Sequence, residues 1–433
     1  MKYDVVIAGG GLAGLTCGVK LAESGLSCAI ISAGQSALHF SSASLDLLSA
    51  LPDGQPVTEP FSALAELARQ APSHPYSVMG ECGVRRAISQ AMSLLQQDDL
   101  QLQGRAEKNH WRLTPMGQWR MSWLSPAVVP VLQEKNSSDL PPLAIIGITG
   151  FLDFQAEMTA AALTRSGYPA QAYTIHLPCL DKLRNNPSEF RSVNIARLLD
   201  IQQNRLQLAD ELKQCAIAEQ ALVLPACFGL DDREAVAFVQ QQLGKTVYQL
   251  PTLPPSLLGI RLHQALLNRF RRAGGFVMPG DTVVSARREG SRITQLFSRN
   301  HGDIPLQAAQ FVLASGSFFS NGLVSDIDHI YEPLLNLRLT QTLPRNAWTS
   351  ADLFARQRYM EAGVAVNAHL NPADDNGTIT NLYAIGAVLG GYNPLQEGCG
   401  AGVSLATAMY AAEQILTQAA ADKKVMHETE VNA

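Results

Sequence analysis

YDVVIAGGGLAGLTCGVKLAESGLSCAIIS, residues 3–32, is the stretch that decides the fold of this chain. Asp4 to Ala8 is a short apolar run of the kind that forms a buried parallel strand. Residues 12–24 carry leucine and valine at helical spacing, and Cys28 to Ile31 is a second apolar run. The order strand, tight turn, helix, strand predicts a dinucleotide-binding unit.

The turn of this unit, residues 9–14, fits the pattern G-x-G-x-x-G. Gly9 allows a sharp turn out of the strand, and Gly11 lets a phosphate approach the backbone. Gly14 allows the helix to pack closely on the strand, and the helix N-terminus offers N–H groups and partial positive charge to the phosphate. A glycine-rich turn without a ligand is the alternative interpretation.

The second strand ends in Ser32, where a nucleotide-binding unit usually carries Asp or Glu for the adenosine ribose. A serine hydroxyl can make one hydrogen bond but cannot hold a ribose diol as a carboxylate does. The sequence therefore supports a phosphate site more strongly than an adenosine site.

The composition limits the possible functions of the chain. Its 433 residues are enough for two or three domains, and its net charge of -5 without a basic block argues against nucleic acid as a partner. The chain enters a strand at once, so we expect no signal peptide, and no uncharged apolar run reaches the roughly 18 residues of a membrane span. The seven cysteines form no C-x-x-C pair and no metal-ligand spacing with histidine, so we predict no metal site and a reducing compartment.

Alternating strands and helices predict an α/β protein with parallel sheets and an inserted α/β domain. We predict a flavin-binding domain in three parts, at 1–75, 252–330 and 376–433. Between these parts we place a small sheet and linker at 76–141, the inserted α/β domain at 142–251 and a further insertion at 331–375. Helices are expected at 189–206, 208–218, 257–272 and 403–419.

Glycine-dense turns lie at 9–14, 314–316 and 398–402, and the first and last open helices. In a flavin-type oxidoreductase such turns meet on one long ligand, and the last helix points its N–H groups at the flavin ring. Helix capping and close packing are the alternative reasons for these glycines. The serine-rich loop after the second strand lies either near the cofactor or in solvent, with Ser capping a helix.

Several strings carry a closer resemblance: GGGLAGLTCG (9–18), GQSALHFSSASLDLLSALPDGQPV (34–57), LPTLPPSLLGIRL (250–262), LASGSFFSNGLV (313–324) and NLYAIGAVLGGYNP (381–394). They resemble the B subunits of the anaerobic glycerol-3-phosphate dehydrogenases, over almost the whole chain. The resemblance implies a Rossmann-like flavin-binding domain of the FAD-dependent oxidoreductase type, similar to the fumarate reductase flavoprotein.

The resemblance also implies the reaction and the partners. The three-subunit complex oxidises sn-glycerol 3-phosphate to dihydroxyacetone phosphate and passes electrons to menaquinone, with fumarate as a terminal acceptor. The A subunit is the FAD-containing catalytic partner, and the C subunit is an iron–sulfur protein that holds the soluble pair at the cytoplasmic membrane. The expected location is therefore the cytoplasm, peripheral to that membrane.

The cofactor that the resemblance implies for this chain is FMN, which agrees with Ser32; FAD is the alternative. Gly386-Ala387 follows the last strand where related flavoproteins often carry Gly-Asp, and this is a second departure in the same direction. The predicted cofactor-binding residues come from the glycine turns and the end of the second strand: Gly9, Gly10, Gly11, Leu12, Ala13, Gly14, Ser32, Ala33, Ser41, Ser42, Ala314, Ser315, Gly316, Gly386, Gly398, Cys399, Gly400 and Ala401.

Oxidation of a phosphorylated alcohol needs a base for the hydroxyl proton and cations for the phosphate. His39 is the candidate base and Arg261 the candidate cation, while Arg184, Arg191 and Arg197 are further cations. We expect this chain to carry electrons through its flavin, with the alcohol oxidised mainly in the FAD-containing catalytic partner. A self-sufficient flavin dehydrogenase and a non-catalytic scaffold with a decayed flavin site are the two alternatives.

Overall fold

Strand β1 (Lys2–Ala8) is the centre of a parallel sheet in the computed structural model of the chain, which describes residues 1–96, 100–135, 140–215 and 217–431. The sheet has the order β12-β2-β1-β15-β20, and all its neighbours run parallel. Its other strands are β2 (Cys28–Ser32), β12 (Phe276–Pro279), β15 (Gln307–Leu313) and β20 (Leu382–Ala384). Val5, Val6 and Ile7 of β1 are fully buried, as the apolar run predicts.

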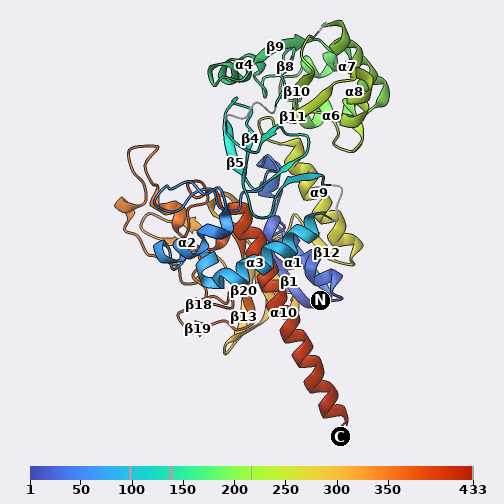
Figure 1. Ribbon diagram of the computed structural model, residues 1–433. Helices are drawn as coiled ribbons and strands as arrows, with labels where there is room; N and C mark the ends of the chain where they lie inside the picture. The colour runs from blue at the N-terminus through green and yellow to red at the C-terminus, as the bar shows by residue number, and fades with distance from the viewer. Residues whose placement is uncertain (97–99, 136–139, 216, 432–433) are drawn as a thin grey trace. The chain divides into compact units, whose positions relative to one another are not determined.

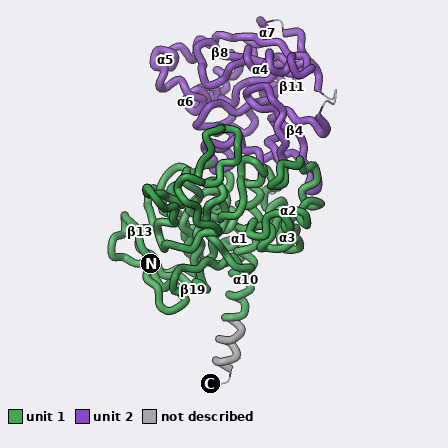
Figure 2. The backbone as a smooth tube through the Cα atoms, turned by 90° about the vertical axis from the view of Figure 1, so that its left-hand side faces the viewer, with its two compact units in different colours: residues 1–37, 46–99, 265–433 green, residues 38–45, 100–264 purple. Residues whose placement is uncertain are grey.

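The chain divides into two units, drawn in different colours in Figure 2. Unit 1 comprises residues 1–37, 46–99 and 265–433, and contains the sheet around β1. Unit 2 comprises residues 38–45 and 100–264. These limits differ from the predicted ones in three places: residues 38–45 and 252–264 belong to unit 2, and residues 76–99 belong to unit 1.

The helices of unit 1 are α1 (Leu12–Glu23), α2 (Leu64–Gln70), α3 (Pro75–Gln96), the second half of α9 (Leu257–Arg272) and α10 (Gly400–Val431). Helix α10 packs against both α1 and α3 (Figure 1). Its buried alanines, among them Ala406, Ala408 and Ala412, allow these helices to approach closely. Three antiparallel hairpins complete the unit: β13 (Val283–Glu289) with β14 (Arg292–Ser298), β16 (Val324–Ser325) with β17 (Ile330–Tyr331), and β18 (Ala373–Asp374) with β19 (Gly377–Thr378).

Unit 2 contains a second parallel sheet with the order β11-β10-β8-β9. Its strands are β8 (Leu143–Ile148), β9 (Ala170–Ile175), β10 (Ala221–Pro225) and β11 (Thr246–Leu250). Its helices are α4 (Ala156–Arg165), α5 (Asp181–Arg184), α6 (Ser192–Leu199), α7 (Gln202–Gln214), α8 (Ala235–Leu243) and the first half of α9. Small antiparallel sheets pair β3 (Leu102–Gly104) with β6 (Leu124–Pro126), and β4 (His110–Leu113) with β5 (Trp119–Ser122) and β7 (Val131–Leu132).

Several predicted elements need correction. The helices expected at 189–206 and 208–218 are α6 and α7, and the break falls at Asp200 because its carboxylate accepts the N–H groups of Gly229 (2.6 Å) and Asp231 (2.7 Å). The last helix begins at Gly400, not at residue 403. Part of the predicted small sheet and linker, 76–141, lies outside the described residues. No helix in the described part of the chain has the length and apolar composition needed to cross a membrane.

Candidate functional site

The carboxyl ends of β2, β1, β15 and β20 lie at one edge of the sheet in unit 1, because these strands are parallel neighbours. Ala8 pairs with Ile31 on one side and with Leu313 on the other. The predicted turns that follow these strands are therefore brought together. Chain order reverses beside β1, and ligands of open α/β sheets bind outside the strand ends at such a point.

Two glycines of the first turn are required by packing within the protein. Gly9 has a φ of +122°, and a Cβ there would lie 2.0 Å from the carbonyl oxygen of Ala314. A Cβ on Gly14 would lie 1.9 Å from the carbonyl oxygen of Gly9. The first and second glycine clusters are thus in backbone contact, as convergence on one ligand requires.

Gly11 differs from these two glycines. A Cβ at Gly11 would meet nothing closer than the Ser36 hydroxyl oxygen, at 3.9 Å. Gly11 precedes α1 without a side-chain cap, and the first turn of α1 carries no acidic residue. The open space and the N–H groups of Leu12 and Ala13 therefore suit an anionic group such as a phosphate.

The second cluster, Ala314 to Gly316, contains an unsatisfied polar atom. The Ser315 hydroxyl oxygen is buried and has no hydrogen-bond partner among the described residues. Ala314 is fixed by its N–H bond to the carbonyl oxygen of Ala8 (2.8 Å). Because buried hydroxyl groups are nearly always hydrogen-bonded, this atom fits contact with a bound molecule.

Gly386 links helices α1 and α10, and the third glycine cluster, 398–402, leads into α10. Gly386 has a φ of +73°, donates its N–H to Thr407 Oγ1 of α10 (2.9 Å), and lies where a Cβ would be 2.7 Å from Cβ of Ala13 in α1. Gly398 has a φ of +55°, and Gly400 and Ala401 form the first turn of α10. The first two clusters are thus in contact, and Gly386 connects the first cluster with the helix that follows the third.

The end of β2 is closely packed. A Cβ on Gly10 would lie 2.9 Å from Cβ of Ser32, and Ala33 follows directly. The Ser32 hydroxyl donates to the carbonyl oxygen of Gly34 (3.2 Å). Asp281 donates its N–H to Ser32 O, but its carboxylate already accepts N–H groups from Thr282 and Asn300 and contacts His301. Asp281 is therefore no substitute for the missing ribose carboxylate.

His74, just before α3, forms a buried cluster with Glu397 and Cys399, just before α10, and this cluster was not predicted from the sequence. His74 Nε2 lies 3.4 Å from Glu397 Oε2 and 3.8 Å from Cys399 Sγ. The donor types would suit zinc, but the backbone N–H of Tyr76 donates to His74 Nδ1 (2.9 Å). Nδ1 therefore carries no proton, and the proton on Nε2 leaves no lone pair there for a metal ion.

The same cluster determines the protonation of the Cys399 thiol, a predicted cofactor-binding residue. Burial raises the pKa of its thiol, and the carboxylates of Glu397 and Asp46 raise it further. Cys399 is fully buried, so it contributes a protonated side chain and a position in the turn rather than a thiolate. His74 and Cys399 are 325 residues apart in the chain, which explains why spacing rules missed the contact.

The predicted catalytic residues lie in unit 2. His39 Nε2 is 3.1 Å from His263 Nδ1, and His263 follows Arg261 by two residues in α9. Gly259 makes this approach possible, since a Cβ there would lie 1.9 Å from the carbonyl oxygen of Leu38. Burial lowers the pKa of His39, so its imidazole is neutral at pH 7.

Ser41 and Ser42 also belong to unit 2, unlike the glycine turns. Their hydroxyl groups make local turn bonds: Ser41 donates to Leu38 O (2.8 Å), and the N–H of Ser44 donates to Ser42 Oγ (3.3 Å). Their predicted role in cofactor binding stays a prediction, as does the role of every other predicted site residue.

Two of the additional arginines are engaged in ion pairs. Arg184 pairs with Asp181 and donates to Thr149 O, and Arg191 pairs with Asp153 (2.6 Å). Arg197 is exposed and donates to Asn194 Oδ1 (3.3 Å). Arg261 is the predicted cation that lines a cavity.

Comparison with known proteins agrees with this geometry. The family described as FAD binding domain matches residues 4–403. The B subunit of the anaerobic glycerol-3-phosphate dehydrogenase of Yersinia enterocolitica is 55% identical over 418 residues, covering 96% of this chain and 99% of its own length. The protein of that name from Pectobacterium atrosepticum is 54% identical over 420 residues, with coverage of 96% and 99%.

Among solved structures, 3-ketosteroid delta1-dehydrogenase of Sterolibacterium denitrificans is 10% identical, with a TM-score of 0.46 and coverage of 96% of this chain and 100% of that one. The FAD binding domain match confirms the predicted fold class, and the two relatives confirm the resemblance. The chain therefore carries an FAD binding domain and belongs to the family of the B subunits of the anaerobic glycerol-3-phosphate dehydrogenases.

Proposed function

We propose that this chain is the flavin subunit of a quinone-linked dehydrogenase that oxidises sn-glycerol 3-phosphate to dihydroxyacetone phosphate. The observation that carries the proposal is identity of 54–55% with proteins of this family over nearly their full length. The open approach to Gly11 and the unpartnered Ser315 hydroxyl support a bound flavin in unit 1.

The proposed cofactor is FMN, with FAD as the alternative. Ser32 and the engaged Asp281 carboxylate favour a flavin without adenosine. The family match, to an FAD binding domain, favours FAD. When bound, the flavin would carry electrons, and it would also accept the hydride from carbon 2 if the alcohol is oxidised in this chain.

This chain's own residues would serve binding and proton transfer. The N–H groups of Leu12 and Ala13 would hold the flavin phosphate, and the first turn of α10 would offer N–H groups to the ring. His39, neutral and bonded to His263, accepts the hydroxyl proton if the alcohol is oxidised in this chain, and Arg261 binds the substrate phosphate. We place the oxidation mainly in the FAD-containing catalytic partner, with this chain carrying electrons.

The proposed partners are the FAD-containing catalytic partner and the iron–sulfur protein of the complex. Through them the electrons reach menaquinone, with fumarate as the terminal acceptor, and the complex lies on the cytoplasmic face of the membrane. Because the relatives are themselves named as one subunit of an enzyme, their names support assembly with other chains.

The test is to purify the full chain, alone and co-expressed with the FAD-containing catalytic partner, and to identify by mass the flavin that each preparation releases. We expect FMN from this chain in both preparations, and bleaching of the flavin absorbance by glycerol 3-phosphate only when the partner is present. FAD from the chain alone would replace the proposed FMN. The flavin role would be rejected, and the scaffold alternative supported, by two results together. The chain alone would release no flavin, and the co-expressed pair would release only the partner's own FAD.

The second candidate function is a self-sufficient flavin dehydrogenase. The neutral His39 beside His263 favours it, because it provides a base within this chain. Substrate-dependent bleaching in the chain alone, lost in His39→Gln, would support this candidate over the electron carrier.

A further inference from the structure

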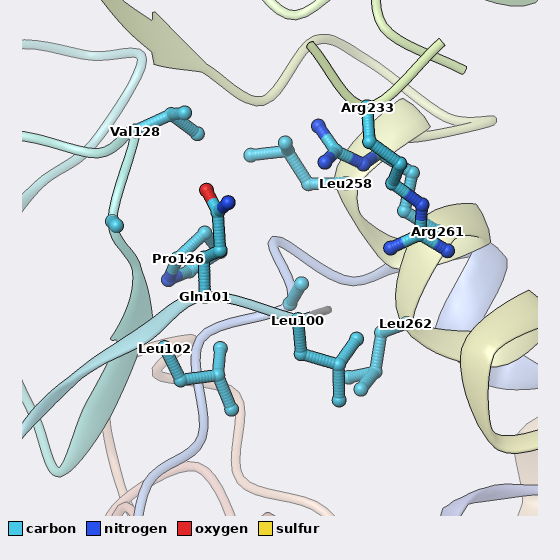
Figure 3. Close-up of a pocket in the computed structure, with 11 residues that line it drawn as sticks. Leu100, Gln101, Leu102, Pro126, Val128, Arg233, Leu258, Arg261 and Leu262 are labelled. Carbon is cyan, nitrogen blue, oxygen red and sulfur yellow. The ribbon is translucent and has the colours of Figure 1, made fainter. Parts of the chain in front are cut away.

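A cavity in unit 2 carries two arginines in a mostly apolar wall. Its empty space is about 400 Å³, which includes open solvent at the mouth. Figure 3 shows Arg233 and Arg261 on one side of the cavity and Gln101 on the other. The remaining lining is apolar: Ala43, Leu100, Leu102, Pro126, Ala127, Val128, Leu258 and Leu262.

Arg261 makes no hydrogen bond or ion pair with any part of the chain that the structure describes. Burial lowers the pKa of Arg261, the charge of Arg233 lowers it further, and Asp200 acts in the opposite direction. A guanidinium group among leucines is costly unless it is paired. The cavity wall therefore holds a cation that an anionic ligand would stabilise.

Contacts of Asp200 and Arg205 hold the loop that carries Arg233 in place. The Asp200 carboxylate accepts the N–H groups of Gly229 and Asp231, and Arg205 pairs with Asp232 at 2.5 Å. The Asp200 carboxylate is thus engaged with the loop backbone. These contacts hold the segment that leads into Arg233 and so fix the position of Arg233 beside Arg261.

We propose that Arg233 and Arg261 bind the phosphate group of a small phosphate monoester in this cavity. Two guanidinium groups balance the two negative charges of such a phosphate, and each can donate two parallel hydrogen bonds. Both arginines are half-buried, and the apolar wall beside them reduces the screening of their charge by water. Gln101 faces the arginines and can bond a hydroxyl group of the ester. The identity of the ester as glycerol 3-phosphate rests on the proposed function.

The test is calorimetric titration of the full chain with sn-glycerol 3-phosphate, inorganic phosphate and glycerol. We expect the two phosphates to bind and glycerol not to bind. Arg233→Gln and Arg261→Gln should each weaken binding by about tenfold or more, because each removes charge-assisted hydrogen bonds. Arg165→Gln, at an exposed position of the same unit, is the control and should bind as the parent does.

Arg261→Lys guards against a folding defect, since it keeps the charge and should retain part of the affinity. Unchanged phosphate affinity in folded Arg233→Gln and Arg261→Gln would overturn the site. The site would also be overturned if the parent chain bound no phosphate and the arginine variants lost only their binding to the FAD-containing catalytic partner. The arginines would then bind an acidic surface of that partner. Phosphate binding that depends on both arginines, without flavin reduction in the complex, would instead refute the proposed function alone.

Discussion

Gly11 and Gly14 offer a sharp test of how the first turn works. Both belong to the G-x-G-x-x-G pattern, yet only Gly14 lacks space for a Cβ within the protein. Alanine at Gly14 would contact the carbonyl oxygen of Gly9 at 1.9 Å, whereas alanine at Gly11 would contact only Ser36, at 3.9 Å. Gly11→Ala should therefore impair flavin binding, and Gly14→Ala should impair folding.

The magnitudes follow from the local geometry. Gly11 has a φ of -84°, which alanine can adopt. Alanine there lowers the conformational entropy of the unfolded chain and so stabilises the folded protein by about 0.4–1 kcal/mol. Loss of glycine from the N-cap costs about the same amount. The net change in unfolding free energy is close to zero. At Gly14 the Cβ must displace backbone, and we expect a loss of about 3 kcal/mol even after a gain of about 1 kcal/mol in helix propensity.

The assay measures flavin content and thermal unfolding of both variants, with and without added flavin. Flavin-free Gly11→Ala should unfold at the same temperature as the flavin-free parent and gain little on adding flavin. Gly14→Ala should unfold at a lower temperature even without flavin. Equal destabilisation of the two flavin-free variants, or full flavin binding by Gly11→Ala, would refute the reasoning.

Other consequences can be measured independently. His110 is buried in β4, and burial and Arg112 lower its pKa to about 4. The free energy of unfolding should therefore fall by roughly 3 kcal/mol as the pH drops from about 6.5 to 4. Urea unfolding at several pH values measures this fall, which should be smaller in His110→Gln. Arg269 bonds Glu23 and Leu94 O, so Arg269→Met should cost about 2 kcal/mol by thermal unfolding, while Arg271→Met, at an exposed position of the same helix, should cost little. Dialysis against a chelator should leave stability unchanged because Nδ1 of His74 is an acceptor; stoichiometric zinc lost in His74→Ala would contradict this.

The sequence predicted the parts of the fold that depend on local pattern. The apolar runs of β1 and β2 and the glycine turn between β1 and α1 follow from spacing alone. The helix predicted at 257–272 has the same limits as α9. These elements are set by residues within a few turns of one another, which is the range that a periodic pattern can report.

Long-range contacts could not be read in the same way. The end of α6 depends on Asp200 reaching the backbone of Gly229, and the state of Cys399 depends on its burial beside His74 and Glu397. The cavity joins Arg233 with Arg261 only after α9 packs in unit 2. In each case the partner is chosen by the fold rather than by spacing, so the residue type alone gives no signal.

The position of β1 in its sheet has a consequence for synthesis of the chain on the ribosome. Its neighbour β2 begins at Cys28, but its other neighbour β15 begins only at Gln307, about 300 residues later. At translation rates of about 5–20 residues per second, that interval lasts roughly 15–60 s. The bulk of unit 2, residues 100–264, emerges in the meantime and has its own parallel sheet. The nascent chain thus has an interval in which the inserted segment can fold first, while the apolar strands at the N-terminus need protection from aggregation.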